Sequence, residues 1–395
     1  MKNILFLPIA MFAFGMDAYI VAGIIPEIST SFHITEAQTA QMVTAFTLCY
    51  ALSAPILATL LAGFPTKKAL VLSMLVFIAA NIVTIFSTNL TMLLISRAFA
   101  GIGAGIFSPL AAASAASLVP AEKKGRALGL LLGGMSAGTV VGVPAGLAFA
   151  TWLGWQGVFA VVIAIALIGL VGVVLGVPHI CVAPPPSLKA RVALLTNRSV
   201  SATITVTFLT AVASLGLYSY LAPVITGITQ HTNLTPYLWV WGLGGMIGSF
   251  TIGHLIDWVK RPRAILLGIL TLMSVAIFSI PSGLSIPSSL PLPSMIAFVP
   301  FFLWGAAGWS SLAPQQHTLI SLQPDHSAAV VALNSSSNYL GGAVGTLLGG
   351  LWLSHGLSVT QLVYAAAAVG GVAIVIQIGI LRRNANPVTT ECKSS

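Results

Sequence analysis

Charged side chains are scarce in this chain. Of its 395 residues only 6% are Asp, Glu, Lys or Arg, whereas 57% are hydrophobic. Soluble domains carry about 25% charged residues, so a surface that faces water cannot be built from this composition. The length fits about twelve membrane-spanning helices joined by short loops. The composition therefore predicts an all-α polytopic membrane protein whose main solvent is the lipid bilayer.

Cysteine is also rare, and its placement excludes a disulfide framework. Cys49, Cys181 and Cys392 lie far apart, and no pair has the spacing of metal ligands or of a redox motif. The histidines show no zinc-binding spacing either. No phosphate-binding loop and no nucleophile–base pair is present, which argues against an ATP-driven pump and makes a membrane enzyme the weakest alternative. We therefore expect a protein that is not an enzyme and has no metal and no cofactor.

The net charge of +9 does not indicate a nucleic-acid partner. The basic residues form small clusters between apolar runs, with no basic face and no interleaved aromatic residues. Basic residues placed in this way are typical of the cytoplasmic loops of a membrane protein.

Twelve apolar runs follow one another along the chain, and an open-ended structure in lipid has to be helical to satisfy its own backbone. The first run follows Lys2 and continues past the length of a signal-peptide core, without a cleavage site after it. The expected spans are 4–27, 38–63, 69–88, 91–118, 125–150, 155–177, 200–226, 236–257, 263–283, 293–322, 328–353 and 358–381.

The positions of Lys and Arg predict the orientation in the membrane. If the N-terminus is cytoplasmic, every Lys and Arg except Arg97 falls on the inner side, and the six outer loops contain none. Loops rich in Lys and Arg remain in the cytoplasm. We therefore expect a multi-pass protein of the inner membrane with both termini in the cytoplasm.

The longest inner connection, residues 178–199, contains a run of three prolines from Pro184 followed by basic residues. Such a run is typical of a linker. It divides the chain into an N-terminal half (1–177), a C-terminal half (200–383) and a cytoplasmic tail (384–395).

Glycines recur at intervals of four residues in the fifth and eleventh spans, which hold equivalent places in the two halves. They are Gly134, Gly138, Gly142 and Gly146, and Gly341, Gly345 and Gly349. This spacing places glycines on one helix face, where a neighbouring backbone can approach. The repetition indicates a six-plus-six repeat, which in transporters places the substrate site near the midplane between the halves.

Three segments resemble the major facilitator superfamily. The segment 134–146 is similar to the antiporter motif of its fifth helix, 97–105 to its fourth-helix motif with an intramembrane arginine, and 14–26 to the first helix of its twelve-span drug:proton antiporters. The resemblance implies two six-helix bundles related by a pseudo-two-fold axis, a monomer, and export driven by protons. It also assigns gating or packing roles to Gly138, Gly142 and Pro144.

One motif departs from the family pattern. The inner loop after the second span has Ala62 and Gly63 where the family carries an acid and an arginine. The corresponding loop of the second half, with Asp257 and Arg261, is closer to that pattern. The resemblance therefore implies a conformational latch that works mainly through the second half.

Asp17 is the one acid that lies well inside an expected span, about 20 Å along the first helix at 1.5 Å per residue. A carboxylate at that depth faces a cavity or a partner, because lipid does not solvate it. Arg97 in the fourth span lies at a similar depth. We interpret the pair as a proton-coupling site. Asp17 as the counter-ion of a bound cation, and a permanent salt bridge that only fixes helix packing, are the alternatives.

Deeply placed aromatic and amide side chains are candidates for binding a substrate. Tyr218, Trp304, Gln315 and Asn338 lie where a polar group needs a partner. Trp239 and Trp241 lie nearer the outer end of their span, which is typical of interfacial anchors.

Taken together, these features predict a proton-coupled antiporter that exports small molecules, drug-like amphiphiles or cations, by alternating access. A proton-coupled exporter of a polar metabolite such as a sugar or nucleoside is the nearest alternative. An importer and a non-transporting membrane sensor are further alternatives.

Overall fold

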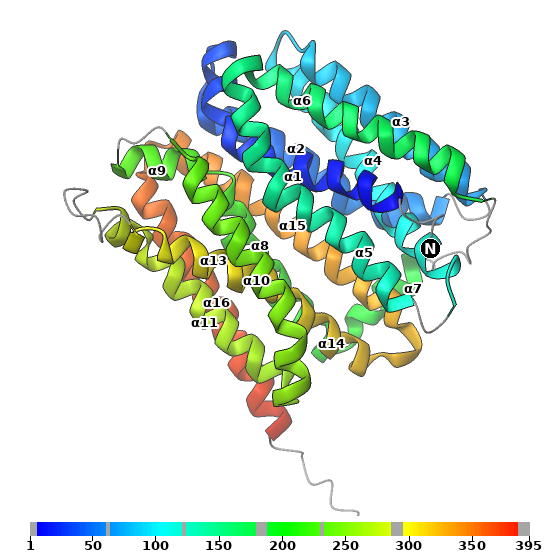
Figure 1. Cartoon of the computed structure of the whole chain (residues 1–395). Helices are drawn as coiled ribbons and strands as arrows, with labels where there is room; N and C mark the ends of the chain where they lie inside the picture. Colours follow the sequence, from blue (N-terminus) through cyan, green and yellow to red (C-terminus); the bar gives the residue numbers. More distant parts are fainter. Residues whose placement is uncertain are drawn as a thin grey trace, which may run out of the picture.

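The computed structural model describes residues 6–60, 64–120, 124–178, 188–229, 233–285 and 295–385. Within these ranges the chain is helical and contains no strand (Figure 1). The predicted all-α architecture is therefore confirmed. Helices alone suit a chain whose backbone polar groups lie in lipid.

One bundle is built by the first part of the chain, coloured blue to green in Figure 1. Its elements are α1 (Phe6–Phe32), α2 (Glu36–Leu60), α3 (Thr66–Ile85), α4 (Leu90–Ser117), α5 (Lys124–Ala137), a π-helical segment (Gly138–Gly142) and α6 (Val143–Gly176). A short helix, α7 (Leu188–Ala193), follows within the predicted linker. The proline run of that linker lies outside the described residues.

The second bundle, green to red in Figure 1, contains the remaining helices. They are α8 (Arg198–Tyr218), α9 (Leu221–Thr229), α10 (Thr235–Val259), α11 (Pro262–Leu284), α13 (Val299–Ser310), α14 (Leu312–Leu322), α15 (Ser327–Ser354) and α16 (Val359–Ala385). The two bundles meet where α2 packs along α15, with further contacts from α1 to α9 and from α10 to the π-helical segment.

Several expected spans are interrupted in the structure. The seventh breaks after Tyr218 into α8 and α9, and the tenth breaks at Ser311, just before Pro314, into α13 and α14. Proline lacks an N–H and crowds the preceding turn, which explains the second break. Among the described helices, seven are long and apolar enough to cross a membrane when each is judged alone. The other spans are broken or carry more Gly, Ser, Thr and amide side chains.

The fifth and sixth spans run as one stretch of helix that changes direction at Gly154. This residue has φ 66°, a left-handed conformation that glycine adopts without a Cβ clash. Pro144 lies in the first turn of α6, directly after the π-helical segment Gly138–Gly142. The antiporter-like segment is therefore distorted at its centre.

The glycine faces pack as the four-residue spacing predicts. A Cβ at Gly138 would collide with the carbonyl of Phe12 in α1, and one at Gly345 would collide with the carbonyl of Val212 in α8. Each half thus uses its glycine-rich helix to bring a backbone against its own first helix.

Candidate functional site

Asp17 of α1 and Arg97 of α4 form a two-pronged ion pair inside the first bundle. Arg97 Nη2 lies 2.8 Å from Asp17 Oδ2, and Arg97 Nη1 lies 2.9 Å from Oδ1. Their side chains are 0% and 1% exposed. Paired N–H donors on a planar guanidinium match the two oxygens of a carboxylate, and charge-assisted bonds of this kind are the strong ones.

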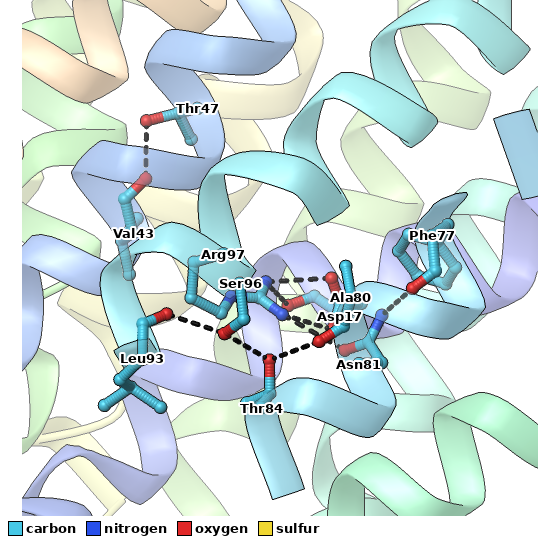
Figure 2. Close-up of polar contacts among 10 residues, drawn as sticks. All are labelled: Asp17, Val43, Thr47, Phe77, Ala80, Asn81, Thr84, Leu93, Ser96 and Arg97. Atoms are coloured by element: carbon cyan, nitrogen blue, oxygen red, sulfur yellow. Dashed lines mark hydrogen bonds and ion pairs between the residues drawn. The ribbon is translucent and has the colours of Figure 1, made fainter. Parts of the chain in front are cut away.

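Further groups surround the guanidinium from α2, α3 and α6. Arg97 Nη1 also donates to Asn81 Oδ1 at 3.2 Å, and Asn81 Nδ2 donates to the Phe77 carbonyl (Figure 2). Arg97 Cζ lies 4.9 Å from the ring centre of Phe46 and 5.4 Å from that of Phe159. These cation–π contacts offset part of the lost hydration, while Nε has no partner among the described residues.

A neutral hydrogen bond beside the ion pair joins α3 to α4. The hydroxyls of Thr84 and Ser96 lie 2.8 Å apart (Figure 2). Ser96 is the neighbour of Arg97, so the bond helps to fix the position of the arginine's backbone between α1 and α3.

A small cavity lies between the two bundles, and α1 lines it with the residues that directly follow Asp17. Ala18 and Tyr19, the next residues after Asp17 in α1, line that cavity. The full lining is Ala18, Tyr19 and Ala22 from α1, Val43 and Thr47 from α2, Leu215, Tyr218 and Ser219 from α8 and its end, and Tyr339, Gly342 and Thr346 from α15. Its volume of about 20 Å³ holds a water molecule, not a substrate, so a ligand can enter only when the bundles move apart.

Aromatic rings from both bundles meet at this place. The ring centre of Tyr19 lies 5.5 Å from Tyr218, 6.0 Å from Trp241 and 5.8 Å from Trp309, and Tyr218 lies 4.3 Å from Trp241. We call these four side chains the aromatic cluster. Trp241 is 1% exposed, so its expected role as an interfacial anchor is wrong: its helix face is turned to the other bundle.

The four predicted substrate residues do not all reach the cavity. Tyr218 lines it. Trp304 lies one ring further away, 6.1 Å from Trp241, and its indole Nε1 donates to Ser214 Oγ at 2.8 Å. Gln315 and Asn338 do not line it, and Asn338 is only partly buried.

Gln315 instead lies inside the second bundle with both amide atoms unpartnered among the described residues. Leu319, one turn further along α14, packs with Val200 of α8 and Val330 of α15. Asn334 of α15 accepts a hydrogen bond from Thr207 Oγ1 at 2.6 Å but leaves its own Nδ2 unpartnered. These neutral amides form no part of the inter-bundle cavity.

The sequence analysis missed Tyr19, Trp241 and Tyr339 as site residues. Tyr19 follows Asp17 by two positions, which is a usable signal. Tyr339 lies beside Asn338, and its ring centre is 3.8 Å from that of Tyr50 across the bundle interface. A larger cavity, about 410 Å³, lies between the C-terminal parts of α8 and α15 and the N-terminal part of α16, and its lining is mostly apolar and contains no residue of the first bundle.

The predicted gating residues occupy two separate places. Gly138, Gly142 and Pro144 lie in or next to the π-helical segment that packs on α1. Asp257 and Arg261 are exposed at the end of α10, and within the described ranges neither forms an ion pair. Ala62 and Gly63, from the first-half loop, lie outside the described residues. The latch stays a prediction.

The chain is similar in sequence to several known proteins and to one family model. The sequence model of the Major Facilitator Superfamily matches residues 7–346. The inner membrane transport protein YdhP of Escherichia coli (strain K12) is 26% identical over 379 residues, 94% of each chain. The chloramphenicol resistance protein of Streptomyces lividans is 30% identical over 266 residues, 66% of this chain and 67% of that one. A probable sugar efflux transporter of Mannheimia succiniciproducens is 27% identical over 379 residues, 94% of this chain and 92% of that one.

Proposed function

The chain belongs to the major facilitator superfamily, and on that premise we propose that it exports a small molecule from the cytoplasm in exchange for protons, by alternating access. Members of this family are transporters and not enzymes, and the chain is a multi-pass integral membrane protein. Which molecule it moves, and what drives the movement, are the parts that we propose.

The observation that carries the proposal is the buried ion pair Asp17–Arg97, whose acid directly precedes the residues of α1 that line the inter-bundle cavity. A proton on Asp17 neutralises the carboxylate and removes the charge–charge part of its bond to Arg97. Losing one partner of a buried pair costs about 3–5 kcal/mol, which is enough to favour a different arrangement of α1 and α4. Movement of α1 then shifts Ala18 and Tyr19, which line the cavity, so that proton uptake and ligand access are linked.

Asn81 and the rings of Phe46 and Phe159 still stabilise the Arg97 guanidinium when Asp17 is protonated. The hydrogen bond to Asn81 and the contacts with Phe46 and Phe159 do not depend on the carboxylate. The guanidinium therefore retains part of its stabilisation. The protein can stay folded in a conformation in which the ion pair is broken. We assign Asp17 the role of proton carrier and Arg97 that of its positioning partner.

Two observations support the direction of transport. The segment 134–146 resembles the antiporter motif, and it packs on α1, the helix that carries Asp17. Two relatives bear names that describe efflux or resistance. We place the chain in the inner membrane with both termini in the cytoplasm, on the distribution of Lys and Arg. A monomer suffices, because one chain supplies both walls of the cavity.

Two classes of substrate follow from the relatives' names. Resistance to chloramphenicol favours a drug-like amphiphile, and sugar efflux favours a polar metabolite. For either substrate, we assign Gly138, Gly142 and Pro144 to a hinge at the π-helical segment, which lets α5 and α6 move with α1. We assign Asp257 and Arg261 to a latch on the inner side of the second bundle.

Transport in proteoliposomes tests the proposal. Wild-type protein is reconstituted, and efflux of chloramphenicol and of lactose is followed under a pH gradient of either sign and with a protonophore. We expect a gradient to drive at least one compound against its concentration, and the direction to reverse with the gradient. Uptake or efflux that ignores both the gradient and the protonophore would rule out proton coupling.

A further inference from the structure

The cavity between the bundles offers a ligand no charged side chain. Among the residues that line it there is no Asp, Glu, Lys, Arg or His. Asp17 does not line the cavity, and both of its carboxylate oxygens accept hydrogen bonds from Arg97 (Figure 2). Its side chain is fully buried, as is that of Arg97, so neither charge faces the cavity.

A charged ligand would therefore lose its hydration without gaining a counter-ion. Burying an unpaired charge is the costliest transfer from water, whereas a neutral polar group needs only its hydrogen bonds. The aromatic cluster can attract a cation over the ring faces, but that attraction does not replace a missing carboxylate. The lining favours an uncharged ligand over both a cation and an anion.

Two rings of the aromatic cluster, Tyr19 and Tyr218, line the cavity, and Trp241 and Trp309 contact them from outside its lining. Tyr19, Tyr218, Trp241 and Trp309 meet with ring centres 4.3–6.1 Å apart, contributed by both bundles. Trp241 is buried, and its indole N–H has no partner among the described residues. A buried donor without a partner is costly, so it is suited to an acceptor that arrives with a ligand.

We propose that the ligand is a neutral molecule that combines a ring with hydroxyl or carbonyl groups, and that it stacks in the aromatic cluster while Trp241 Nε1 donates to one of its oxygens. This inference rests on the proposed function, because it requires that the cavity opens during transport. It narrows the substrate class: lipophilic cations, one of the classes predicted from the sequence, are disfavoured.

Equilibrium binding to the full chain in nanodiscs tests the class without any proton gradient. Three probes are titrated calorimetrically: phenyl β-D-glucoside (neutral, with a ring), methyl β-D-glucoside (neutral, without a ring) and trimethylphenylammonium (a cation with the same ring). We expect phenyl β-D-glucoside to bind at least tenfold more tightly than either of the others. Equal or tighter binding of the cation, or no binding of the phenyl glucoside, overturns the proposal.

Matched variants separate recognition from packing. Trp241→Phe keeps a ring and removes the N–H, and we expect it to weaken phenyl glucoside binding about fivefold to tenfold, whereas Trp239→Phe, on the exposed side of the same helix, leaves binding unchanged. Tyr218→Leu should reduce the preference for the phenyl over the methyl glucoside, with Tyr364→Leu on exposed α16 as its control. If these rings only pack the interface, the variants lower the thermal midpoint but leave the preference intact, which contradicts the proposal.

Failure of this proposal and of proton-coupled export can be told apart. Binding selectivity is measured at one pH with no gradient, so it does not depend on Asp17 carrying a proton. Gradient-driven flux in the reconstituted wild type does not depend on which probe binds best in nanodiscs. A cation that binds and is exported under a pH gradient would overturn the substrate class alone.

Discussion

The two bundles join equivalent helices by different chemistry. In the first, α1 and α4 are connected by the ion pair Asp17–Arg97. In the second, α8 and α13 hold the places of the first and fourth spans, and they are connected by the hydrogen bond from Trp304 Nε1 to Ser214 Oγ. An indole and a hydroxyl stay neutral at physiological pH, whereas a carboxylate can take up a proton. The comparison confines the proposed proton response to the first bundle.

Backbone packing, in contrast, is the same in both bundles. Gly138 meets the Phe12 carbonyl of α1, and Gly345 meets the Val212 carbonyl of α8. The repeat therefore preserved the close approach of its first and fifth helices while the polar contacts diverged. Variants that act on one bundle at a time can test whether only the first is sensitive to charge.

The largest effect is expected from Arg97→Leu. It leaves the Asp17 carboxylate buried without its partner, and we expect the free energy of unfolding to fall by about 3–5 kcal/mol. Chemical unfolding in detergent micelles measures this. The double variant Asp17→Asn with Arg97→Gln should recover most of the loss, because two neutral amides replace the pair. A single variant as stable as the wild type would contradict the account of a strongly coupled pair.

The next effect is expected from Gly138→Ala. The added methyl group collides with the Phe12 carbonyl, and overpacking of this kind costs up to about 3 kcal/mol. Gly133→Ala in the same helix is the control, because a Cβ there meets nothing within 4 Å. The thermal midpoints of the two variants are compared. Equal midpoints would mean that α1 and the π-helical segment are not tightly packed.

A smaller effect is expected from Ser214→Ala in the second bundle. It leaves the buried Trp304 N–H without its acceptor, which costs about 1–2 kcal/mol. Because no charge is involved, the pH dependence of transport should match that of the wild type. Initial rates between pH 6 and pH 8 give the profile, and a shifted profile would show that the second bundle also takes part in coupling.

The smallest effect is expected from Gln315→Met. Both amide atoms of Gln315 are buried and unpartnered among the described residues, so an apolar side chain of similar length removes a desolvation cost. We expect stability to rise by up to about 1 kcal/mol, measured as a higher thermal midpoint. A clear fall would show that the amide is satisfied by a bound water or ligand.

The helical fold could be predicted from the sequence, because a lipid environment allows few kinds of backbone structure. Low charge content, apolar runs and glycines at intervals of four residues predicted the helices and the close contacts of Gly138 and Gly345. The depth of Asp17 and Arg97 along their helices also predicted that they can meet. Each of these predictions needs only the position of a residue along its own helix.

Which side chains face the cavity depends on the rotation of each helix about its axis, and the sequence does not specify that rotation. Depth alone made Gln315 and Asn338 equal candidates to Tyr218, but only Tyr218 turns toward the cavity. Trp241 lies close to a span end, yet the packing of α10 on the other bundle buries it. Pro314 accounts for the break at Ser311, whereas the break after Tyr218 was not predicted from the sequence.

The central claim is that Asp17 carries the proton and does not merely hold α1 to α4. The most direct test compares two activities of Asp17→Asn in the same proteoliposomes: exchange of labelled ligand at equal pH, and accumulation driven by a pH gradient, with Ser214→Ala as the neutral counterpart. The account predicts that Asp17→Asn keeps exchange and loses gradient-driven accumulation, whereas Ser214→Ala keeps both. Gradient-driven accumulation by Asp17→Asn at the wild-type rate would contradict it.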